Sequence, residues 1–286
     1  MRRLVSPPER AHSRASDPIC FKTVGPESGG LRTLIVAGWV ALASFAGQAV
    51  ESPLEMATIY AATVDRRLAV PAEEAQRYAA LLVEALQQAG LTHLPDQYLV
   101  LVDRSPQVQA ALVFFKAADA VPQLIGASPA STGRPGRFDY FETPTGVFDH
   151  SIANLDFRAE GSKNSQGIRG YGVKGMRVFD FGWQQAPKGW GDRRLATMRL
   201  QMHATDPDYL EPRLGTAQSK GCIRIPAALN RLIDHYGLLD ADYERALDRG
   251  KRLWMLSPQR QPTPWSGRYL IVVDSQRTAR PPWARR

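Results

Sequence analysis

The chain has 286 residues, of which 44% are hydrophobic and 22% charged, and its formal net charge is +8. This composition is typical of a globular protein with one sizeable core, and it excludes a fibrous or wholly disordered chain. The basic residues are scattered and no nucleic-acid-reading motif is present, so we expect an anionic surface or polymer as partner, and no nucleic acid.

The N-terminal region predicts export. Residues 1–30 are polar, and Arg32 then precedes a short apolar run at 34–46 that ends in small residues up to Ala49. This pattern is typical of a secretory signal peptide, so we expect residues 1–49 to form a leader cleaved after Ala49. The mature protein would then be periplasmic or associated with the cell wall. A buried helix or an uncleaved leader is the alternative, and an uncleaved leader would be the only membrane attachment.

Export changes the interpretation of the two cysteines. Cys20 would be lost with the leader, which leaves Cys222 alone in the mature chain. A single thiol in an oxidising compartment cannot form an internal disulfide, so it is either buried and inert or kept for its reactivity. The sequence contains no CxxC or HExxH motif and its histidines are scattered, so we expect neither a metal nor a cofactor.

Residues 50–97 are predicted to form an N-terminal helical segment. Within it, Pro71 to Ala89 places apolar residues on one side and acidic residues in the first turn, as an amphipathic helix does. The period then changes to short runs rich in β-branched and aromatic residues, separated by Gly, Pro and Ser. These runs predict strands at 98–102, 108–115, 121–127 and 137–141, and therefore a mainly β domain.

The second half of the chain begins with a long segment, 151–191, that is rich in glycine and aromatic residues. It is interpreted either as a lid or substrate wall or as a hairpin extension whose aromatics pack. Residues 195–203 alternate as a strand that ends at His203. Beyond the motif that follows, we expect helices at 226–237 and 240–249 and strands at 252–256 and 269–274.

A histidine and a cysteine motif supply the elements of thiol chemistry. His203 is followed by the sequence Ser219-Lys220-Gly221-Cys222-Ile223-Arg224. Attack of a thiol on a carbonyl requires a base, and His203 is the natural one. Glycine at 221 allows the backbone to turn, so that the amides of Gly221 and Cys222 can point at an oxyanion. Arg224 emerges on the same side as Cys222 and can pair with a substrate carboxylate. The bland alternative is a small buried cysteine.

These residues resemble the L,D-transpeptidase catalytic domain, or YkuD domain, of bacterial cell-wall enzymes. The matching parts are Thr143-Pro144-Thr145-Gly146, His203, Gly215 and the motif 219–224. The resemblance covers residues 98–256 and implies a mainly β, mixed sandwich-like fold with short helices. Residues 257–286 then form a C-terminal extension with a basic tail.

The resemblance also implies a reaction. Cys222 would attack the bond between a diamino acid and D-alanine in a peptidoglycan tetrapeptide stem, release D-alanine and form a thioester that an amine resolves. His203 would be the base, and the carbonyl of Ala204, where many members have glycine, would orient it. Ser219 and Arg224 would support the loop or hold the donor stem. Lys220 stands where some members have a second histidine.

The expected partners are peptidoglycan stem peptides and, as a further acceptor, a lysine of a wall-anchored protein. The same acyl-enzyme with water as acceptor would be an L,D-carboxypeptidase, and with a free D-amino acid it would exchange the end of the stem. From a different class, a cell-wall-binding module without catalytic activity would keep the fold alone. The motif does not separate these alternatives.

Overall fold

The structure is a computed structural model that describes residues 52–284, all within one compact unit that spans Phe45–Arg286. The predicted leader at 1–49, with Cys20 and the cleavage site after Ala49, lies outside the described residues. Among residues 52–284, no helix has the length and apolar character needed to cross a bilayer.

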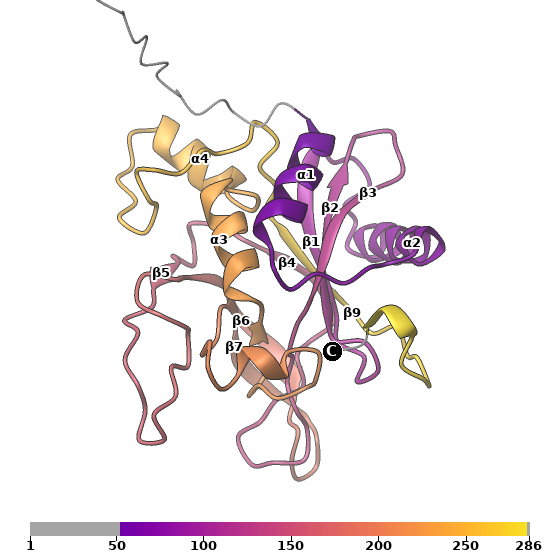
Figure 1. Ribbon diagram of the computed structural model, residues 1–286, viewed down its shortest axis with the longest axis vertical. Helices are drawn as coiled ribbons and strands as arrows, with labels where there is room; N and C mark the ends of the chain where they lie inside the picture. Colours follow the sequence, from indigo (N-terminus) through magenta and orange to yellow (C-terminus); the bar gives the residue numbers. More distant parts are fainter. Residues whose placement is uncertain (1–51, 285–286) are drawn as a thin grey trace, which may run out of the picture. The chain divides into compact units, whose positions relative to one another are not determined.

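The described strands form two mixed sheets (Figure 1). The first sheet has the order β3-β2-β1-β9-β4, in which β1 and β9 are parallel and the other neighbours antiparallel. Its strands are β1 (Gln97–Asp103), β2 (Ala110–Lys116), β3 (Gln123–Pro129), β4 (Gly146–Asp149) and β9 (Tyr269–Val273). The second sheet has the order β5-β6-β7-β8, in which β7 and β8 are parallel. Its strands are β5 (Phe157–Arg158), β6 (Arg177–Pro187), β7 (Leu195–His203) and β8 (Ile223–Arg224).

Helices cover both faces of the first sheet. Figure 1 shows α2 (Ala72–Gln88) on one side of β1 and β2, and α1 (Pro53–Thr63) and α3 (Ala227–His235) on the other. Helix α4 (Ala241–Asp248) follows α3, and two short 3-10 turns complete the elements, η1 (Glu211–Arg213) and η2 (Pro282–Ala284).

Strand β1 separates two apolar cores. Tyr98, Val100 and Val102 pack into a core shared with the second sheet, α1 and α3. Leu99 and Leu101 pack into a second core against α2 and η2. Because side chains alternate along a strand, a strand buried on both faces is a continuous apolar run. This explains the run of apolar residues that the sequence shows at 98–102.

Helix α1 lies within the helical segment predicted at 50–97, although the sequence analysis did not give it separate bounds. Its N-terminus is capped by the Ser52 hydroxyl, which accepts a hydrogen bond from the Glu55 amide at 3.1 Å. The Tyr60 ring lies over Gly126 of β3, where a Cβ atom would stand 2.3 Å from ring carbons. The Tyr60 hydroxyl also hydrogen-bonds the Ser128 hydroxyl at 2.6 Å. Contacts distant in sequence therefore fix α1 to the sheet.

The fold prediction is confirmed only in part. The predicted amphipathic helix is present as α2, but the described chain mixes helices and sheets and is not simply a β domain. The strand predicted at 137–141 is wrong, because only Phe141 makes an isolated bridge there. The strand predicted at 252–256 is also wrong, because its backbone folds into turns such as Leu256 N–H to Leu253 O at 3.1 Å.

The segment at 151–191 divides into two parts. Its second part is β6, which forms an antiparallel hairpin with β7, as the hairpin interpretation expected. Its first part is mostly loop and lines a cavity described below. The C-terminal extension supplies β9, which lies between β1 and β4.

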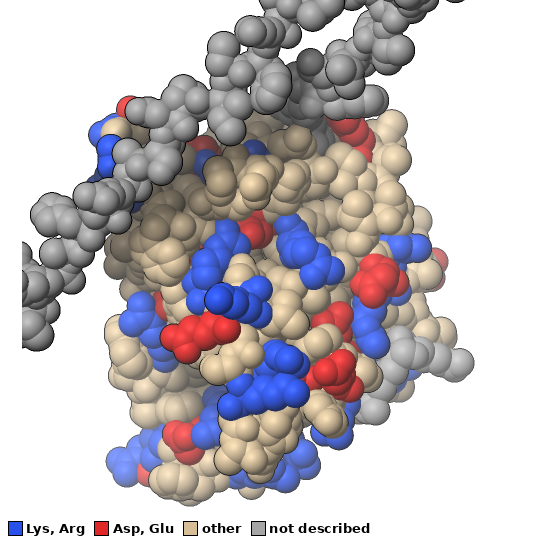
Figure 2. All heavy atoms as spheres, turned by 60° about the vertical axis from the view of Figure 1, so that its left-hand side comes forward, with Lys and Arg blue, Asp and Glu red and all other residues tan. Residues whose placement is uncertain are grey.

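Charged side chains of both signs share the surface. Figure 2 shows the face brought forward from the side of β5 and α4, where Lys and Arg are interspersed with Asp and Glu. Two ion pairs of the described chain illustrate this mixing, Arg158 with Asp234 and Arg245 with Asp242. The positive net charge is therefore distributed over this face and is not collected into one stripe.

Candidate active site

The pairing of β7 with β8 brings the histidine and the cysteine motif together. In this parallel pair, Met202 lies opposite Ile223 and His203 opposite Arg224. Met202 and Ile223 are part of the shared core, so their neighbours along each strand take the opposite face. The face away from the core therefore carries Gln201 and His203 from β7 and Cys222 and Arg224 from the chain at β8.

Cys222 is a partly buried free thiol just before β8. Its S–H group donates to the Arg199 carbonyl with a sulfur–oxygen distance of 3.8 Å. Burial raises the pKa of the Cys222 thiol, and this outweighs the hydrogen bond from the Gln201 amide and the nearby charge of Arg224, which lower it. The resting thiol is therefore protonated near pH 7 and needs a base.

His203 is buried at the end of β7, with only 4% of its surface exposed. Its Nδ1 lies 2.5 Å from the Ala204 carbonyl oxygen. A carbonyl only accepts hydrogen bonds, so Nδ1 carries the proton and Nε2 keeps a free lone pair. Burial lowers the pKa of His203 to about 4, with the Ala204 hydrogen bond opposing this and the charge of Arg224 adding to it. The imidazole is therefore neutral near pH 7.

The turn before Cys222 is shaped by Ser219. The Ser219 hydroxyl donates to the Cys222 carbonyl at 2.5 Å and accepts from the Gly221 amide at 3.0 Å. The N–H group of Gly221, which we expected to point at an oxyanion, therefore donates its hydrogen bond to the Ser219 hydroxyl in this structure. The neighbouring side chain of Lys220 is exposed and pairs with Asp139 at 2.8 Å, away from the buried part of the site.

Only glycine fits at position 221. Its φ angle is +130°, which residues with a Cβ atom rarely adopt. A Cβ built there would lie 2.8 Å from Met198 Sδ and 3.1 Å from Phe141 Cβ. Gly221 therefore lets the chain turn sharply under two packed side chains and present the next residue, Cys222.

Thr143 fixes the same turn from the first sheet's side. Its hydroxyl donates to the Gly221 carbonyl at 2.7 Å and accepts from the Gly133 amide at 2.9 Å. In the sequence, residues 143–146 were noted only as one of the parts that match the family, with no role for Thr143. The structure shows that Thr143, buried to 1% exposure, connects that turn to the cysteine loop.

Arg224 is a largely buried cation without an acidic partner in the described part of the chain. Burial lowers the pKa of its guanidinium, while the Cys222 and Tyr140 side chains raise it. Its Nε atom is buried and has no hydrogen-bond partner. The Arg224 backbone exchanges two hydrogen bonds with Ser131, at 2.8 and 2.9 Å, so its position is fixed. A fixed, desolvated guanidinium beside a thiol is suited to an anionic group of a ligand.

Sequence reasoning missed Tyr171. This residue comes from the glycine-rich segment, and its ring meets the His203 ring edge to face with 4.7 Å between centroids. Its hydroxyl donates to Gln201 Oε1 at 3.1 Å. Burial raises the pKa of the Tyr171 hydroxyl, and the charge of a Cys222 thiolate would raise it further, so Tyr171 lies close to both reactive groups.

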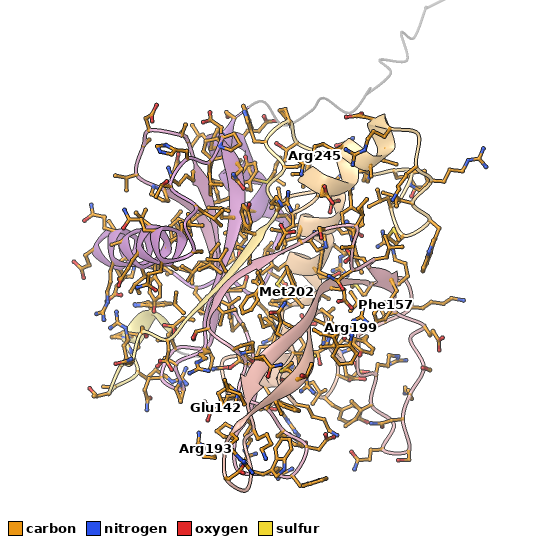
Figure 3. The ribbon with its side chains drawn as sticks, turned by 180° about the vertical axis from the view of Figure 1, so that it is seen from behind. Glu142, Phe157, Arg193, Arg199, Met202 and Arg245 are labelled. Atoms are coloured by element: carbon orange, nitrogen blue, oxygen red, sulfur yellow. The ribbon has the colours of Figure 1, made fainter. Side chains whose placement is uncertain are left out.

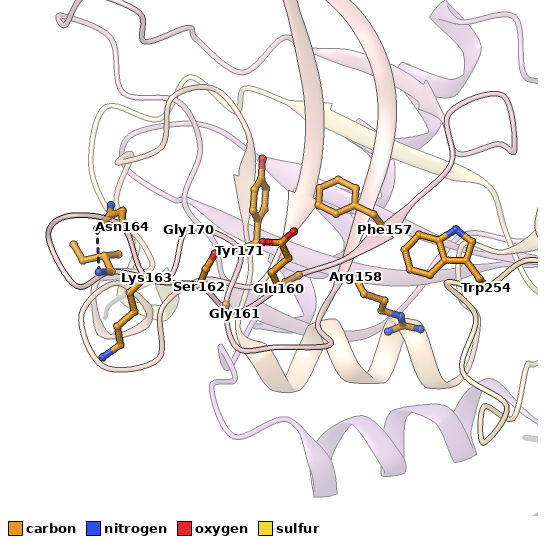
Figure 4. Close-up of a pocket in the computed structure, with 13 residues that line it drawn as sticks. Phe157, Arg158, Glu160, Gly161, Ser162, Lys163, Asn164, Gly170, Tyr171 and Trp254 are labelled. Carbon is orange, nitrogen blue, oxygen red and sulfur yellow. Dashed lines mark hydrogen bonds between the residues drawn. The ribbon is translucent and has the colours of Figure 1, made fainter. Parts of the chain in front are cut away.

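Tyr171 also forms a wall of a cavity of about 590 Å³ (Figure 4). The cavity is bounded by the loop at 159–172, with Phe157 and Trp254 as further aromatic walls. Trp254 is 70% exposed, and no described residue forms an ion pair with the Glu160 carboxylate. Tyr171 contacts the imidazole as well, so this one side chain belongs both to the cavity wall and to the surroundings of His203.

Strands β6 and β7 carry ion pairs around this site. Figure 3 labels Arg199 and Met202 on β7, and Arg199 Nε binds Asp180 of β6 at 2.7 Å. Figure 3 also shows Glu142 and Arg193, which pair near the turn of the hairpin. No group of three or more His, Cys, Asp or Glu residues suited to a metal ion occurs within residues 52–284.

No model of a known protein family matches the sequence, and no curated protein matches it.

Proposed function

We propose that the protein is a peptidoglycan L,D-transpeptidase that uses Cys222 as its nucleophile, on an L,D-transpeptidase catalytic fold. The observation that carries the proposal is the pairing of β7 with β8, which puts a partly buried thiol and a neutral imidazole, held by a backbone carbonyl, on the same face of the second sheet. The proposal includes export, with residues 1–49 as the leader and the periplasm or cell wall as the working compartment.

The first half of the proposed reaction forms a thioester. Cys222 Sγ attacks the carbonyl carbon of the diamino acid while the thiol proton moves to Nε2 of His203. The imidazolium then gives this proton to the leaving nitrogen, the C–N bond breaks, and D-alanine departs. The Ala204 carbonyl stabilises the imidazolium during this step, since it accepts from Nδ1.

The Cys222 amide is proposed to donate a hydrogen bond to the developing oxyanion. The Gly221 amide already donates to the Ser219 hydroxyl, so Ser219 and Gly221 act by stabilising the turn.

The second half of the reaction transfers the acyl group to an amine. That amine loses its proton to His203 as it attacks the thioester carbon, and the C–S bond breaks to restore the thiol.

The two substrates are proposed to bind at different parts of the site. Arg224 would pair with a carboxylate of the donor stem, since it has no acidic partner among the described residues. The acceptor stem would bind in the cavity lined by Tyr171, whose ring also contacts the His203 imidazole. The unpaired Glu160 carboxylate in the cavity wall favours a cationic amine.

Incubation of the mature protein with muropeptide tetrapeptides tests the proposal, with products identified by mass spectrometry. A dimer linked between two diamino acids is the expected product. A tripeptide would indicate a carboxypeptidase, an exchanged stem a free D-amino acid as acceptor, and a stem joined to a protein lysine a wall-anchoring role. No change in the muropeptide would indicate a binding module and overturn the enzyme proposal.

Covalent labelling by a carbapenem-type lactam tests the nucleophile directly. Cys222→Ala should lose the mass increase of one acyl adduct, and His203→Gln should slow its formation by about 100-fold or more. Lys220→Ala is the matched control, since this exposed side chain lies in the same motif but contacts Asp139 and the Tyr140 ring. Labelling that survives in Cys222→Ala would refute the assignment.

A further inference from the structure

Tyr171 covers the catalytic imidazole with its ring. The two rings stand 67° apart with centroids 4.7 Å from each other, so the tyrosine ring occupies space that water would otherwise take. The backbone beside it is equally close, because a Cβ at Gly172 would lie 3.0 Å from Ala204 Cβ. The glycine-rich loop therefore packs directly on the end of β7.

A chain of hydrogen bonds holds this ring in place. The Tyr171 hydroxyl donates to Gln201 Oε1 at 3.1 Å, and Gln201 Nε2 donates to Asp180 Oδ2 at 2.8 Å. Asp180 is buried to 1% exposure and also accepts from Arg199 Nε at 2.7 Å and from the Gly182 amide at 2.8 Å. A carboxylate only accepts hydrogen bonds, so Asp180 fixes which end of the Gln201 amide faces Tyr171.

We propose that Tyr171 is a positioning residue that keeps His203 dry and correctly oriented, and that Gln201, Asp180 and Arg199 hold it in that position. The proposal rests on the proposed function only in regarding His203 as the base. It assigns a role to part of the glycine-rich segment, which the motif at 219–224 does not include.

If Tyr171 has this role, removal of its ring should change the pKa of His203. The groups that face the imidazole are the Ala204 carbonyl, the Arg224 guanidinium and the Tyr171 ring, with Cys222 on the neighbouring strand. Burial is the main cause that lowers the pKa of His203 to about 4. Removal of the Tyr171 ring admits water to one face of the imidazole, and the pKa should rise toward the ordinary value of about 6.5.

An NMR titration of the imidazole C–H signals in the full mature protein, without substrate, tests this inference. The His203 signal is assigned by its absence in His203→Gln. Tyr171→Ala should raise the titration midpoint of His203 by about one pH unit or more. Tyr171→Leu, which refills part of the space, keeps the test valid if the alanine variant does not fold. A midpoint unchanged in both variants would overturn the proposal.

Two further variants test the anchor. Tyr171→Phe keeps the ring, so the titration midpoint of His203 should stay near its low wild-type value. Loss of the hydrogen bond to Gln201 should raise this midpoint only slightly. Adding Gln201→Leu to Tyr171→Phe should then cause no further rise, because the bond between the two side chains is already absent; a further rise would overturn the anchoring role. Tyr209→Ala is the control, since Tyr209 is 53% exposed and lies outside this chain of contacts. The titration needs no peptidoglycan, so its failure is separable from failure of the proposed activity.

Discussion

The side chain of His150 makes the most specific prediction about stability. Its Nδ1 lies 2.8 Å from the Leu239 carbonyl oxygen, and its Nε2 lies 2.9 Å from Asp156 Oδ1. A carbonyl and a carboxylate only accept hydrogen bonds, so both ring nitrogens must donate. His150, fully buried, is therefore an imidazolium in the folded protein.

The surroundings of His150 balance this charge. Arg177 is fully buried and binds Asp156 at 2.6 Å and Asp240 at 2.7 and 2.8 Å, while the Tyr243 ring stacks on the imidazole at 4.9 Å. Arg177 also pairs with Asp234 at 3.3 Å and Asp240 with Arg260 at 3.8 Å, so charges of both signs surround His150. Burial lowers the pKa of His150, but the charge and hydrogen bond of Asp156, with help from Asp240 and against Arg177, raise it above its ordinary value.

The sign of the pH dependence follows from this raised pKa. The unfolded chain binds the proton less tightly, so the stabilisation by His150 is complete below its unfolded pKa of about 6.5 and is lost as the pH rises through the folded value. Removing one partner of a buried ion pair costs about 3–5 kcal/mol. For His150→Gln at pH 6 we expect about 3 kcal/mol, because Asp156 keeps Arg177 and the Asp180 amide as donors.

Urea unfolding followed by tryptophan fluorescence measures this effect between pH 5.5 and 9.5. Groups common to the wild type and His150→Gln titrate in both proteins, so their contributions cancel in the difference. The difference in free energy of unfolding between the wild type and His150→Gln should be largest at pH 5.5–6 and should decrease as the pH rises. A gap that is constant or that widens with pH would show that His150 is neutral in the folded state.

Two further predictions concern the turn that presents the thiol. Gly221→Ala should lower the free energy of unfolding by about 1–3 kcal/mol, because φ is +130° there, and should slow lactam acylation by about 100-fold through displacement of Cys222; an acylation rate equal to wild type would contradict this. Thr143→Val should cost about 1–3 kcal/mol in urea unfolding, because the Gly221 carbonyl and Gly133 amide lose their partner. Thr143→Ser keeps the hydroxyl and should recover most of that loss; an equally unstable serine variant would argue against the hydrogen bonds.

The local part of the site was predictable because the motif is contiguous. Ser219, Gly221 and Cys222 are linked by hydrogen bonds within one turn, but the expected orientation of the Gly221 amide toward an oxyanion was wrong, because this amide donates to the Ser219 hydroxyl. Tyr171 and Asp180 were not predictable in this way. Their contacts with His203, Gln201 and Arg199 depend on how a long loop and a hairpin return to β7. Abundant glycine and aromatic residues marked the segment, but not which aromatic would meet the imidazole.

The fold shows the same division between local and distant causes. Strands β1 and β2 were predicted because each is a continuous run of apolar residues, and β7 and helix α2 because each has one clear period. Helix α1 has weak amphipathic character and is held by contacts of Tyr60 with Gly126 and Ser128. Residues 252–256, wrongly predicted as a strand, contain as many apolar residues as a strand usually does. One of them, Trp254, is 70% exposed and lines the cavity.

The C-terminal extension contributes both to the fold and to the geometry of the candidate site. Strand β9 pairs in parallel with β1 and antiparallel with β4, so the first sheet is continuous only when the end of the chain is in place. Beyond β9, Arg280 donates to the Gly215 carbonyl at 3.1 Å and to the Pro106 carbonyl at 2.9 Å. Gly215 in turn donates to the Ala130 carbonyl at 2.7 Å, just before the turn that carries Cys222. Residues beyond β9 therefore hold the segment around Gly215 that leads to the Cys222 turn, and the geometry of the site is a property of the whole described chain.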